Sequence, residues 1–244
     1  MLTKNQVKYI QSLGQKKARD GEGVFIAEGP KTVEEFLKAP DTHIRQIFAL
    51  KKWADANREK AVHTELVEID EADLERISQQ KTPNQVLAVV SKYKANEMPD
   101  IKNKITLALD TIQDPGNMGT IIRIADWFGV KNIICSKDSA DIYNPKVVQS
   151  TMGSLARVNI MYADLAGWLS VNQSVPVYVT ALAGTSVNSI GKLKEGIIII
   201  GNESKGVSET IAHTAANIIS IPRGGGAESL NAAVATGIIL SHVC

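Results

Sequence analysis

The chain has 244 residues, of which 44% are hydrophobic and 22% are charged, and its formal net charge is +1. This composition is typical of a globular protein, and the length suffices for one large domain or two ordinary ones. No apolar run reaches the roughly eighteen residues that a membrane span needs, the opening residues lack a signal-peptide core, and two cysteines cannot make a disulfide framework, so we expect a cytoplasmic protein without membrane contact.

The first predicted element is a helix over residues 1–20, because apolar residues recur with helical spacing at Val7, Ile10 and Leu13. Basic side chains gather on the same segment, where Asp20 is the only acid. They are Lys4, Lys8, Lys16, Lys17 and Arg19. Such a cluster indicates either a solvated helix face or a nucleic-acid contact, and charge alone does not separate the two.

Short strands and helices then alternate before a break in the pattern. Strands are predicted over 24–29, 44–50, 61–69 and 84–92, and helices over 31–37 and 71–78. The polar, proline-containing stretch that follows is typical of a linker. We therefore predict a small α/β domain over residues 1–95, a linker over 96–104 and a second domain over 105–244.

The second domain alternates more regularly. Its strands are predicted over 105–110, 131–136, 175–182, 196–201 and 217–222, and its helices over 116–129, 144–156, 208–216 and 229–243. These strands are apolar without the two-residue alternation of a half-exposed sheet, as expected when both faces are buried. The predicted fold class is α/β, with a parallel sheet covered by helices.

Several common chemistries lack their motifs. No G-x-G-x-x-G follows the first strand of the sheet, and no P-loop or G-x-S-x-G elbow occurs. The histidines, His43, His63, His213 and His242, have no metal-ligand spacing. These patterns exclude dinucleotide-dependent dehydrogenases, P-loop enzymes and serine hydrolases, and we expect no metal site.

Polar residues follow the first strand of the sheet at "DPGNMGTIIRIADWFGV", residues 114–130. Asn117 is the predicted N-cap of the helix that begins there. Arg123 stands between Ile122 and Ile124 in the most apolar part of that helix. An arginine at this place either extends to solvent or pairs with a carboxylate, or else it grips a phosphate or faces a reacting oxygen.

Two later strands end in the same way. "IIIIGNESKGVS", residues 197–208, places Gly201 and Glu203 at the carboxyl end of a strand, where open α/β sheets bind ligands. The alternatives are a simple turn and a charge at a helix terminus. "IPRGGGAESLNAAVA", residues 221–235, places Ser229 and Asn231 after a glycine-rich loop that is either a site or a flexible connector.

In this order and spacing, the three segments resemble motifs one to three of the SpoU/TrmH group of RNA ribose 2′-O-methyltransferases, in the SPOUT superfamily. The resemblance covers residues 105–243. "FIAEGPKTVEEFL" and "KTPNQVLAVV" resemble the RNA substrate-binding domain of that group. Arg223 departs from the pattern, because an apolar residue commonly follows the proline, and Ala232 and Ala233 replace a frequent Val-Ser.

The resemblance implies a deep trefoil knot, a homodimer whose active site borrows residues from both subunits, and S-adenosylmethionine held without a metal. The implied cofactor-binding residues are Thr180, Leu182, Gly201, Ile221, Leu230 and Asn231. The implied catalytic residues are Arg123, as the central one, with Asn117, Glu203, Ser229 and Asn231. The implied RNA-binding residues are Lys16, Lys17, Arg19 and Arg123.

The function implied is S-adenosylmethionine-dependent methylation of a ribose 2′-hydroxyl in structured RNA, with 23S-type ribosomal RNA favoured. Two alternatives stay open: a tRNA ribose methyltransferase, and a non-catalytic RNA-binding or ribosome-assembly factor on the same fold. The role of Arg123 also has two interpretations. It is either the base that takes the 2′-proton or a clamp that holds a phosphate and stabilises the developing alkoxide.

Overall fold

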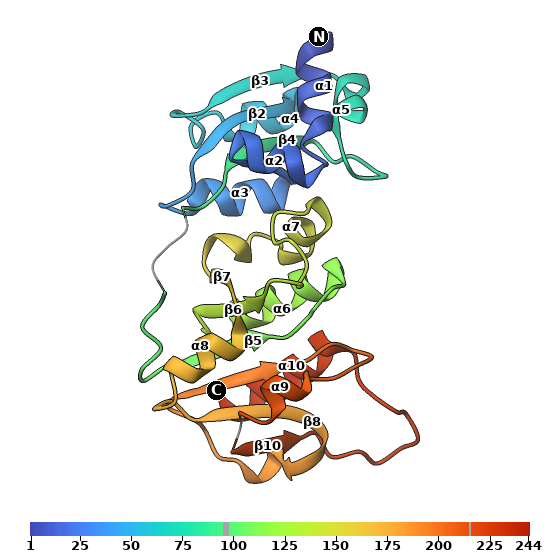
Figure 1. Ribbon diagram of the computed structural model, residues 1–244. Helices are drawn as coiled ribbons and strands as arrows, with labels where there is room; N and C mark the ends of the chain where they lie inside the picture. The colour runs from blue at the N-terminus through green and yellow to red at the C-terminus, as the bar shows by residue number, and fades with distance from the viewer. Residues whose placement is uncertain (95–97, 215) are drawn as a thin grey trace. The chain divides into compact units, whose positions relative to one another are not determined.

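The computed structural model describes residues 1–94, 98–214 and 216–244 (Figure 1). Residues 96 and 97 of the predicted linker, and residue 215 of the predicted helix over 208–216, lie outside this description. The chain forms two compact units. Unit 1 comprises Met1–Lys94 with Asp141–Ala156, and unit 2 comprises Ala95–Ala140 with Arg157–Cys244.

Unit 1 is built on a mixed four-stranded sheet in the order β1-β4-β2-β3. The strands are β1 (Val24–Glu28), β2 (Ile44–Leu50), β3 (Glu65–Ile69) and β4 (Val86–Ser91). Only β2 and β3 pair in parallel, and β4 runs antiparallel to both of its neighbours. The helices are α1 (Lys4–Ser12), α2 (Lys16–Glu22), α3 (Pro30–Lys38), α4 (Lys51–Asn57), α5 (Glu71–Ile77) and α7 (Pro145–Thr151).

The N-terminal segment is not the single helix that was predicted over residues 1–20. It breaks at Gly14 into α1 and α2. The carbonyls of Leu13 and Gly14 accept hydrogen bonds from the Arg19 guanidinium, instead of from the amides four residues on that a continuous helix would supply. α4 was not predicted at all, although it buries Trp53 and Ala54.

One cluster of buried apolar residues in unit 1 is continuous across one face of its sheet. It consists of Leu2, Val7, Ile10, Leu13, Val24, Ile26, Phe48, Ile69, Leu74, Ile77, Leu87 and Val89. The residues with helical spacing in the first segment, Val7, Ile10 and Leu13, are therefore core residues, as their period indicated.

Unit 2 contains a six-stranded sheet in the order β10-β8-β9-β5-β6-β7. Every pairing in it is parallel, which confirms the predicted sheet. The strands are β5 (Ile105–Leu109), β6 (Asn132–Ser136), β7 (Asn159–Ala163), β8 (Val177–Ser186), β9 (Gly196–Ile200) and β10 (Asn217–Ser220). The sequence pattern did not reveal β7, which is only half-buried along most of its length.

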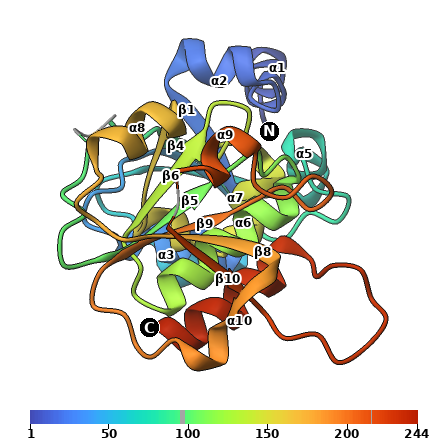
Figure 2. The same ribbon diagram turned by 60° about the horizontal axis from the view of Figure 1, so that its bottom comes forward.

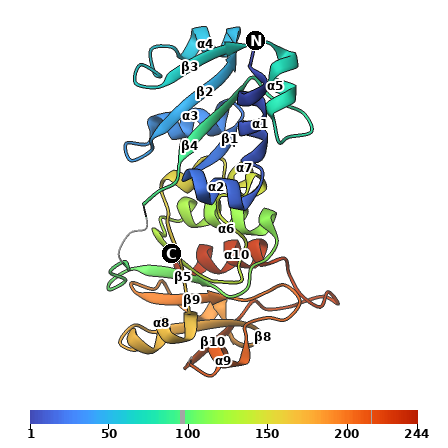
Figure 3. The same ribbon diagram turned by 45° about the horizontal axis from the view of Figure 1, so that its top comes forward.

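Helices cover both faces of this sheet. They are α6 (Pro115–Trp127), α8 (Leu165–Val171), α9 (Glu209–Ala212) and α10 (Ala232–Val243). α6 and α10 pack together on one face, and α8 and α9 lie on the other (Figures 2 and 3). Because all six strands are parallel, their carboxyl ends meet at one edge, and the three polar segments predicted from the sequence begin at that edge.

No helix within the described ranges is long and apolar enough to cross a membrane. The same part of the chain holds no cluster of histidine, cysteine and carboxylate side chains that could bind a metal ion.

Candidate active site

The loops after β5 and β9 are held together by two buried or half-buried side chains. Asp110, only 4% exposed, accepts a hydrogen bond from the Ser208 amide at 2.7 Å. Asn202 donates its side-chain amide to the Thr111 carbonyl at 2.9 Å. The first and second polar segments therefore form one connected structure at the carboxyl edge of the sheet.

The N-cap of α6 is Asp114, and the prediction that Asn117 caps this helix is wrong. Asp114 has extended backbone angles, and Pro115 follows it at the first helical position. The Asp114 carboxylate accepts a hydrogen bond from the backbone amide of Asn117 at 2.7 Å. Proline at this position needs no hydrogen-bond partner, so the cap falls one residue before it. The side chain of Asn117 is consequently free for contacts outside its own helix.

Asn117 is the point at which all three polar segments meet. Its side-chain amide donates to a carboxylate oxygen of Glu203, and its side-chain carbonyl accepts from the Asn231 amide at 2.8 Å. Asn231 in turn caps α10 by accepting from the backbone amides of Ala233 and Val234. The structure thus brings three of the predicted catalytic residues into one hydrogen-bonded cluster, which we call the Asn117 cluster (Asn117, Glu203, Asn231).

A tight turn over residues 201–207 carries Glu203 into the Asn117 cluster. Asn202 and Gly206 exchange backbone hydrogen bonds of 3.0 and 2.9 Å, and the Asn202 side chain accepts from the amides of Ser204 and Lys205. A Cβ at Gly201 would lie 2.3 Å from both the Gly206 carbonyl carbon and the Val207 nitrogen. Glycine is therefore required at position 201 by the turn itself.

Arg123 does not belong to the Asn117 cluster. It lies six residues after Asn117 on α6, so its side chain leaves the helix about 120° away from that of Asn117. The side chain is exposed, and no hydrogen bond or ion pair joins it to another residue in the described part of the chain. One of the predicted alternatives was that Arg123 pairs with a carboxylate, and no such partner is present among the described residues.

Of the remaining site residues, Thr180 and Ile221 are half-buried, whereas Leu182, Ser229 and Leu230 are exposed. Thr180 donates its hydroxyl to the Ile199 carbonyl at 2.9 Å. Leu182 is 78% exposed and Leu230 45% exposed, and Ser229 is exposed on the same loop as Leu230. A Cβ at Gly224, Gly225 or Gly226 would meet nothing within 4 Å, so contacts inside the described chain do not account for these glycines.

Other residues shape this site besides those predicted to be catalytic or cofactor-binding. Asp110, Thr111, Asp114 and Asn202 position the loops through their hydrogen bonds. A carboxylate directly after a buried strand was the available signal for Asp110. Arg223, which stands where an apolar residue is common in the family, donates to the Ala227 carbonyl at 3.3 Å and so spans the glycine-rich loop.

The predicted RNA-binding residues of unit 1 differ in their surroundings. Lys16 and Lys17 are exposed on the first turn of α2. Arg19, by contrast, is 2% exposed and forms an ion pair with Asp141 at 2.6 Å. In this structure a phosphate can reach the two lysines but not the Arg19 guanidinium.

Comparisons with known proteins agree over nearly the whole chain. The SpoU rRNA Methylase family model matches residues 104–241, and the MRM3-like substrate binding domain model matches residues 4–88. The 23S rRNA (guanosine(2553)-2′-O)-methyltransferase RlmP of Bacillus subtilis is 31% identical, over 98% of this chain and 96% of that protein.

Two solved structures with bound S-adenosylmethionine have the same fold. An rRNA methyltransferase from Sinorhizobium meliloti matches with a TM-score of 0.86 and 32% identity, over 98% of this chain and 94% of that one. The SpoU methyltransferase AviRb from Streptomyces viridochromogenes matches with a TM-score of 0.85 and 27% identity, over 98% and 96% of the two chains.

Proposed function

Because this chain belongs to the SpoU rRNA methylase family, we propose that it transfers a methyl group from S-adenosylmethionine to a ribose 2′-hydroxyl in 23S-type ribosomal RNA. The observation that carries this proposal is the Asn117 cluster, in which side chains from all three motifs meet at the carboxyl edge of the parallel sheet. The named activities of the relatives support the reaction and the class of RNA.

The residues at this edge fit S-adenosylmethionine. Leu182 and Leu230 expose large apolar side chains to which an adenine ring can bind, and the loop from Pro222 to Asn231 is exposed along its length. We assign cofactor binding to Thr180, Leu182, Gly201, Ile221, Leu230 and Asn231. When bound, the cofactor supplies a methyl group activated by the positive charge of its sulfonium.

The side chains of the Asn117 cluster orient the acceptor ribose. The Glu203 carboxylate can accept a hydrogen bond from a ribose hydroxyl, while Asn117 fixes the rotamer of Glu203 and Asn231 fixes that of Asn117. Such alignment of the attacking oxygen provides much of the rate in a displacement reaction. Ser229, exposed beside Leu230, is assigned to the same task.

We propose that the chain acts as a homodimer, in which Arg123 of one subunit stabilises charge on the reacting oxygen in the site of the other subunit. A guanidinium keeps its proton in proteins, which favours an electrostatic role over that of a base. Within one chain, Arg123 and the Asn117 cluster point to different sides of α6. An arginine supplied across a two-fold interface would resolve this separation, because each subunit would complete the other's site.

The interface that we propose is the exposed face of α6 and α10. These helices pack together, and each exposes a large apolar residue: Trp127 on α6 is 84% exposed and Val234 on α10 is 51% exposed. Trp127 lies one helical turn beyond Arg123, on the same face. An interface over these residues would therefore place Arg123 beside the partner subunit.

Replacing Val234 by arginine is expected to convert the dimer to monomer, because a buried unpaired charge would oppose association. Analytical ultracentrifugation over a range of concentrations measures the change. The matched control is Val171→Arg on α8, where the valine is 79% exposed on the other face of the sheet. If both variants stay dimeric, or if the wild-type chain is a monomer, the proposed interface is wrong.

The reaction itself is tested by methyl transfer from tritiated S-adenosylmethionine to an unmodified 23S-type ribosomal RNA transcript. We expect label in that RNA, and we expect one phosphodiester bond to resist alkaline hydrolysis, since a 2′-O-methyl group blocks cleavage at its own nucleotide. Label in transfer RNA instead would establish the tRNA alternative. No label in either RNA, with RNA binding intact, would establish the non-catalytic one.

A further inference from the structure

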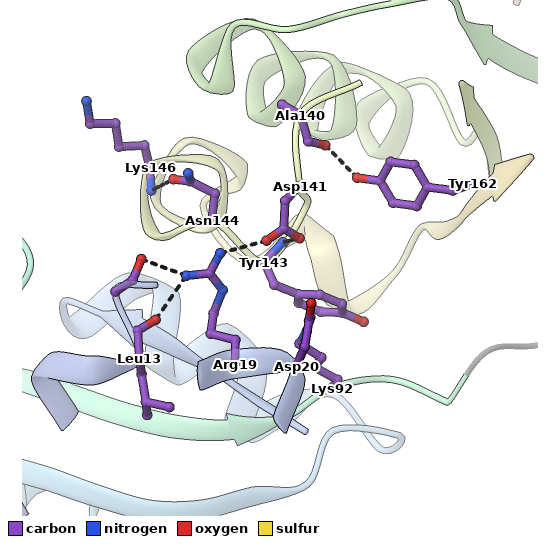
Figure 4. Close-up of polar contacts among 11 residues, drawn as sticks. Leu13, Arg19, Asp20, Lys92, Ala140, Asp141, Tyr143, Asn144, Lys146 and Tyr162 are labelled. Carbon is purple, nitrogen blue, oxygen red and sulfur yellow. Dashed lines mark hydrogen bonds and ion pairs between the residues drawn. The ribbon is translucent and has the colours of Figure 1, made fainter. Parts of the chain in front are cut away.

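The starting observation is the buried arginine of unit 1. One terminal nitrogen of Arg19 donates to the carbonyls of Leu13 at 3.0 Å and Gly14 at 2.8 Å, and the other pairs with Asp141 at 2.6 Å (Figure 4). Asp141 is 122 residues away along the chain. The ion pair therefore fixes the turn between α1 and α2 against the loop that leads into α7.

The loop after α5 contacts both of these segments. The backbone amide of Gln79 in this loop donates to the buried Glu28 carboxylate at 2.9 Å. The Gln79 side chain lies against Gly14, where an added Cβ would be 2.5 Å from the side-chain oxygen of Gln79. The next residue, Gln80, donates a hydrogen bond from its side-chain amide to the side-chain carbonyl oxygen of Gln149 on α7 at 2.8 Å. Three segments distant in sequence are thus held together.

The segment 141–156 is a fixed part of unit 1. The Tyr143 ring lies 5.0 Å from that of Phe25, and its hydroxyl accepts from the Tyr93 amide at 3.1 Å. Gly153 has a positive φ of 92°, and a Cβ there would lie 2.4 Å from that of Glu35 on α3. The start of α7 is consequently as firmly placed as the helices of the N-terminal segment.

Each segment presents lysine next to these contacts. Lys16 and Lys17 follow the Gly14 turn, Lys81 follows Gln80, and Lys146 precedes Gln149 by one turn of α7. All four side chains are exposed, and Lys146 is directed away from the Arg19–Asp141 pair (Figure 4). Across the described residues, none of the four ammonium groups has an ion-pair partner.

Glu22 at the end of α2 is exposed, but the other acids on or beside these contacts are paired or buried. Asp141 pairs with Arg19, Asp20 pairs with Lys92, and Glu28 is 6% exposed with its oxygens bound to the loop after α5. A net positive charge is thus left where the three segments meet, as at sites that bind phosphates.

We propose that Lys16, Lys17, Lys81 and Lys146 form one docking surface for the phosphates of the substrate RNA, hereafter the four-lysine surface. It rests on the proposed function and adds Lys81 and, from the middle of the chain, Lys146 to the RNA-binding residues. Arg19 is a positioning residue: it does not touch RNA but holds the turn that carries Lys16 and Lys17 against the α7 segment.

Reversing the charge at Lys81 and Lys146 together tests the four-lysine surface. We expect the affinity for an unmodified 23S-type ribosomal RNA transcript to fall about tenfold or more in moderate salt, and the slope of log affinity against log salt to decrease by about 1.5, as expected for two lost phosphate contacts. The matched control is the double reversal Lys52→Glu and Lys60→Glu, also exposed on unit 1, with an expected change below about twofold.

The role of Arg19 is tested with Asp141→Asn, which keeps the size of the side chain but removes its charge. We expect weaker RNA binding and a higher KM for RNA, with the affinity for S-adenosylmethionine unchanged, because the affected segments belong to unit 1. A purely structural role would leave the KM for RNA unchanged in the folded fraction of Asp141→Asn.

The outcomes separate this inference from the proposed function. If the wild-type chain methylates RNA, and the Lys81 and Lys146 reversal binds RNA as the control does, the four-lysine surface is wrong and the reaction stands. If the wild-type chain neither binds nor methylates the transcript, the proposed function fails and the surface fails with it.

Discussion

Arg123→Ala is expected to reduce methyl transfer by about a thousandfold while changing the affinity for S-adenosylmethionine by no more than a few-fold. Removing one preorganised donor to a developing oxyanion typically lowers kcat by about 10²–10³-fold. Arg123 is exposed and without a partner in the described chain, so its loss leaves no buried charge and should not disturb the fold. Single-turnover transfer and calorimetric cofactor binding measure the two quantities, and near-normal turnover would contradict the assigned role.

Mixing two inactive variants shows which subunit supplies the arginine. In a heterodimer of Arg123→Ala with Glu203→Ala, one site would combine the intact Glu203 of one chain with the intact Arg123 of the other. Random exchange of subunits should then restore about a quarter of wild-type activity, since half of the dimers are mixed and each has one complete site. If Arg123 instead serves its own chain, both sites of the mixed dimer are defective and no activity returns.

The parallel sheet and the polar edge were predictable because their signals are local. The apolar run of β9 indicated burial on both faces, and the polar residues that follow β5 and β9 had to meet wherever parallel strands end together. The contact of Asn117 with Glu203 and Asn231 is the outcome of that geometry.

Other features depend on partners that no short window of sequence contains. Arg19 resembles its lysine neighbours in a charge pattern, yet it is buried because Asp141 approaches from 122 residues away. The same guanidinium donates to the carbonyls of Leu13 and Gly14, which have no helical partners because α1 ends before them and α2 begins after them. The separation of Arg123 from the Asn117 cluster was not foreseen either, although helix geometry alone implies it once both residues are placed on α6.

Gly201, the first residue of the tight turn over residues 201–207, is a second position where one substitution should abolish activity. In Gly201→Ala, the added Cβ would lie 2.3 Å from backbone atoms of Gly206 and Val207, which have no side-chain rotation to relieve the overlap. The turn must open, the exchanged hydrogen bonds between Asn202 and Gly206 are lost, and Glu203 moves away from Asn117. Overpacking of this kind destabilises a protein by about 1–3 kcal/mol.

We therefore expect Gly201→Ala to remain folded at 25 °C but to lose methyl transfer by more than about a hundredfold, with weaker binding of S-adenosylmethionine, because displacement of about 1 Å at a reacting group has effects of this size. Thermal unfolding, calorimetric cofactor binding and single-turnover transfer measure the three consequences. Gly191→Ala is the matched control, since a Cβ there meets nothing within 4 Å. Full activity in Gly201→Ala would show that the 201–207 turn tolerates opening and that the position of Glu203 in the Asn117 cluster does not matter to the reaction.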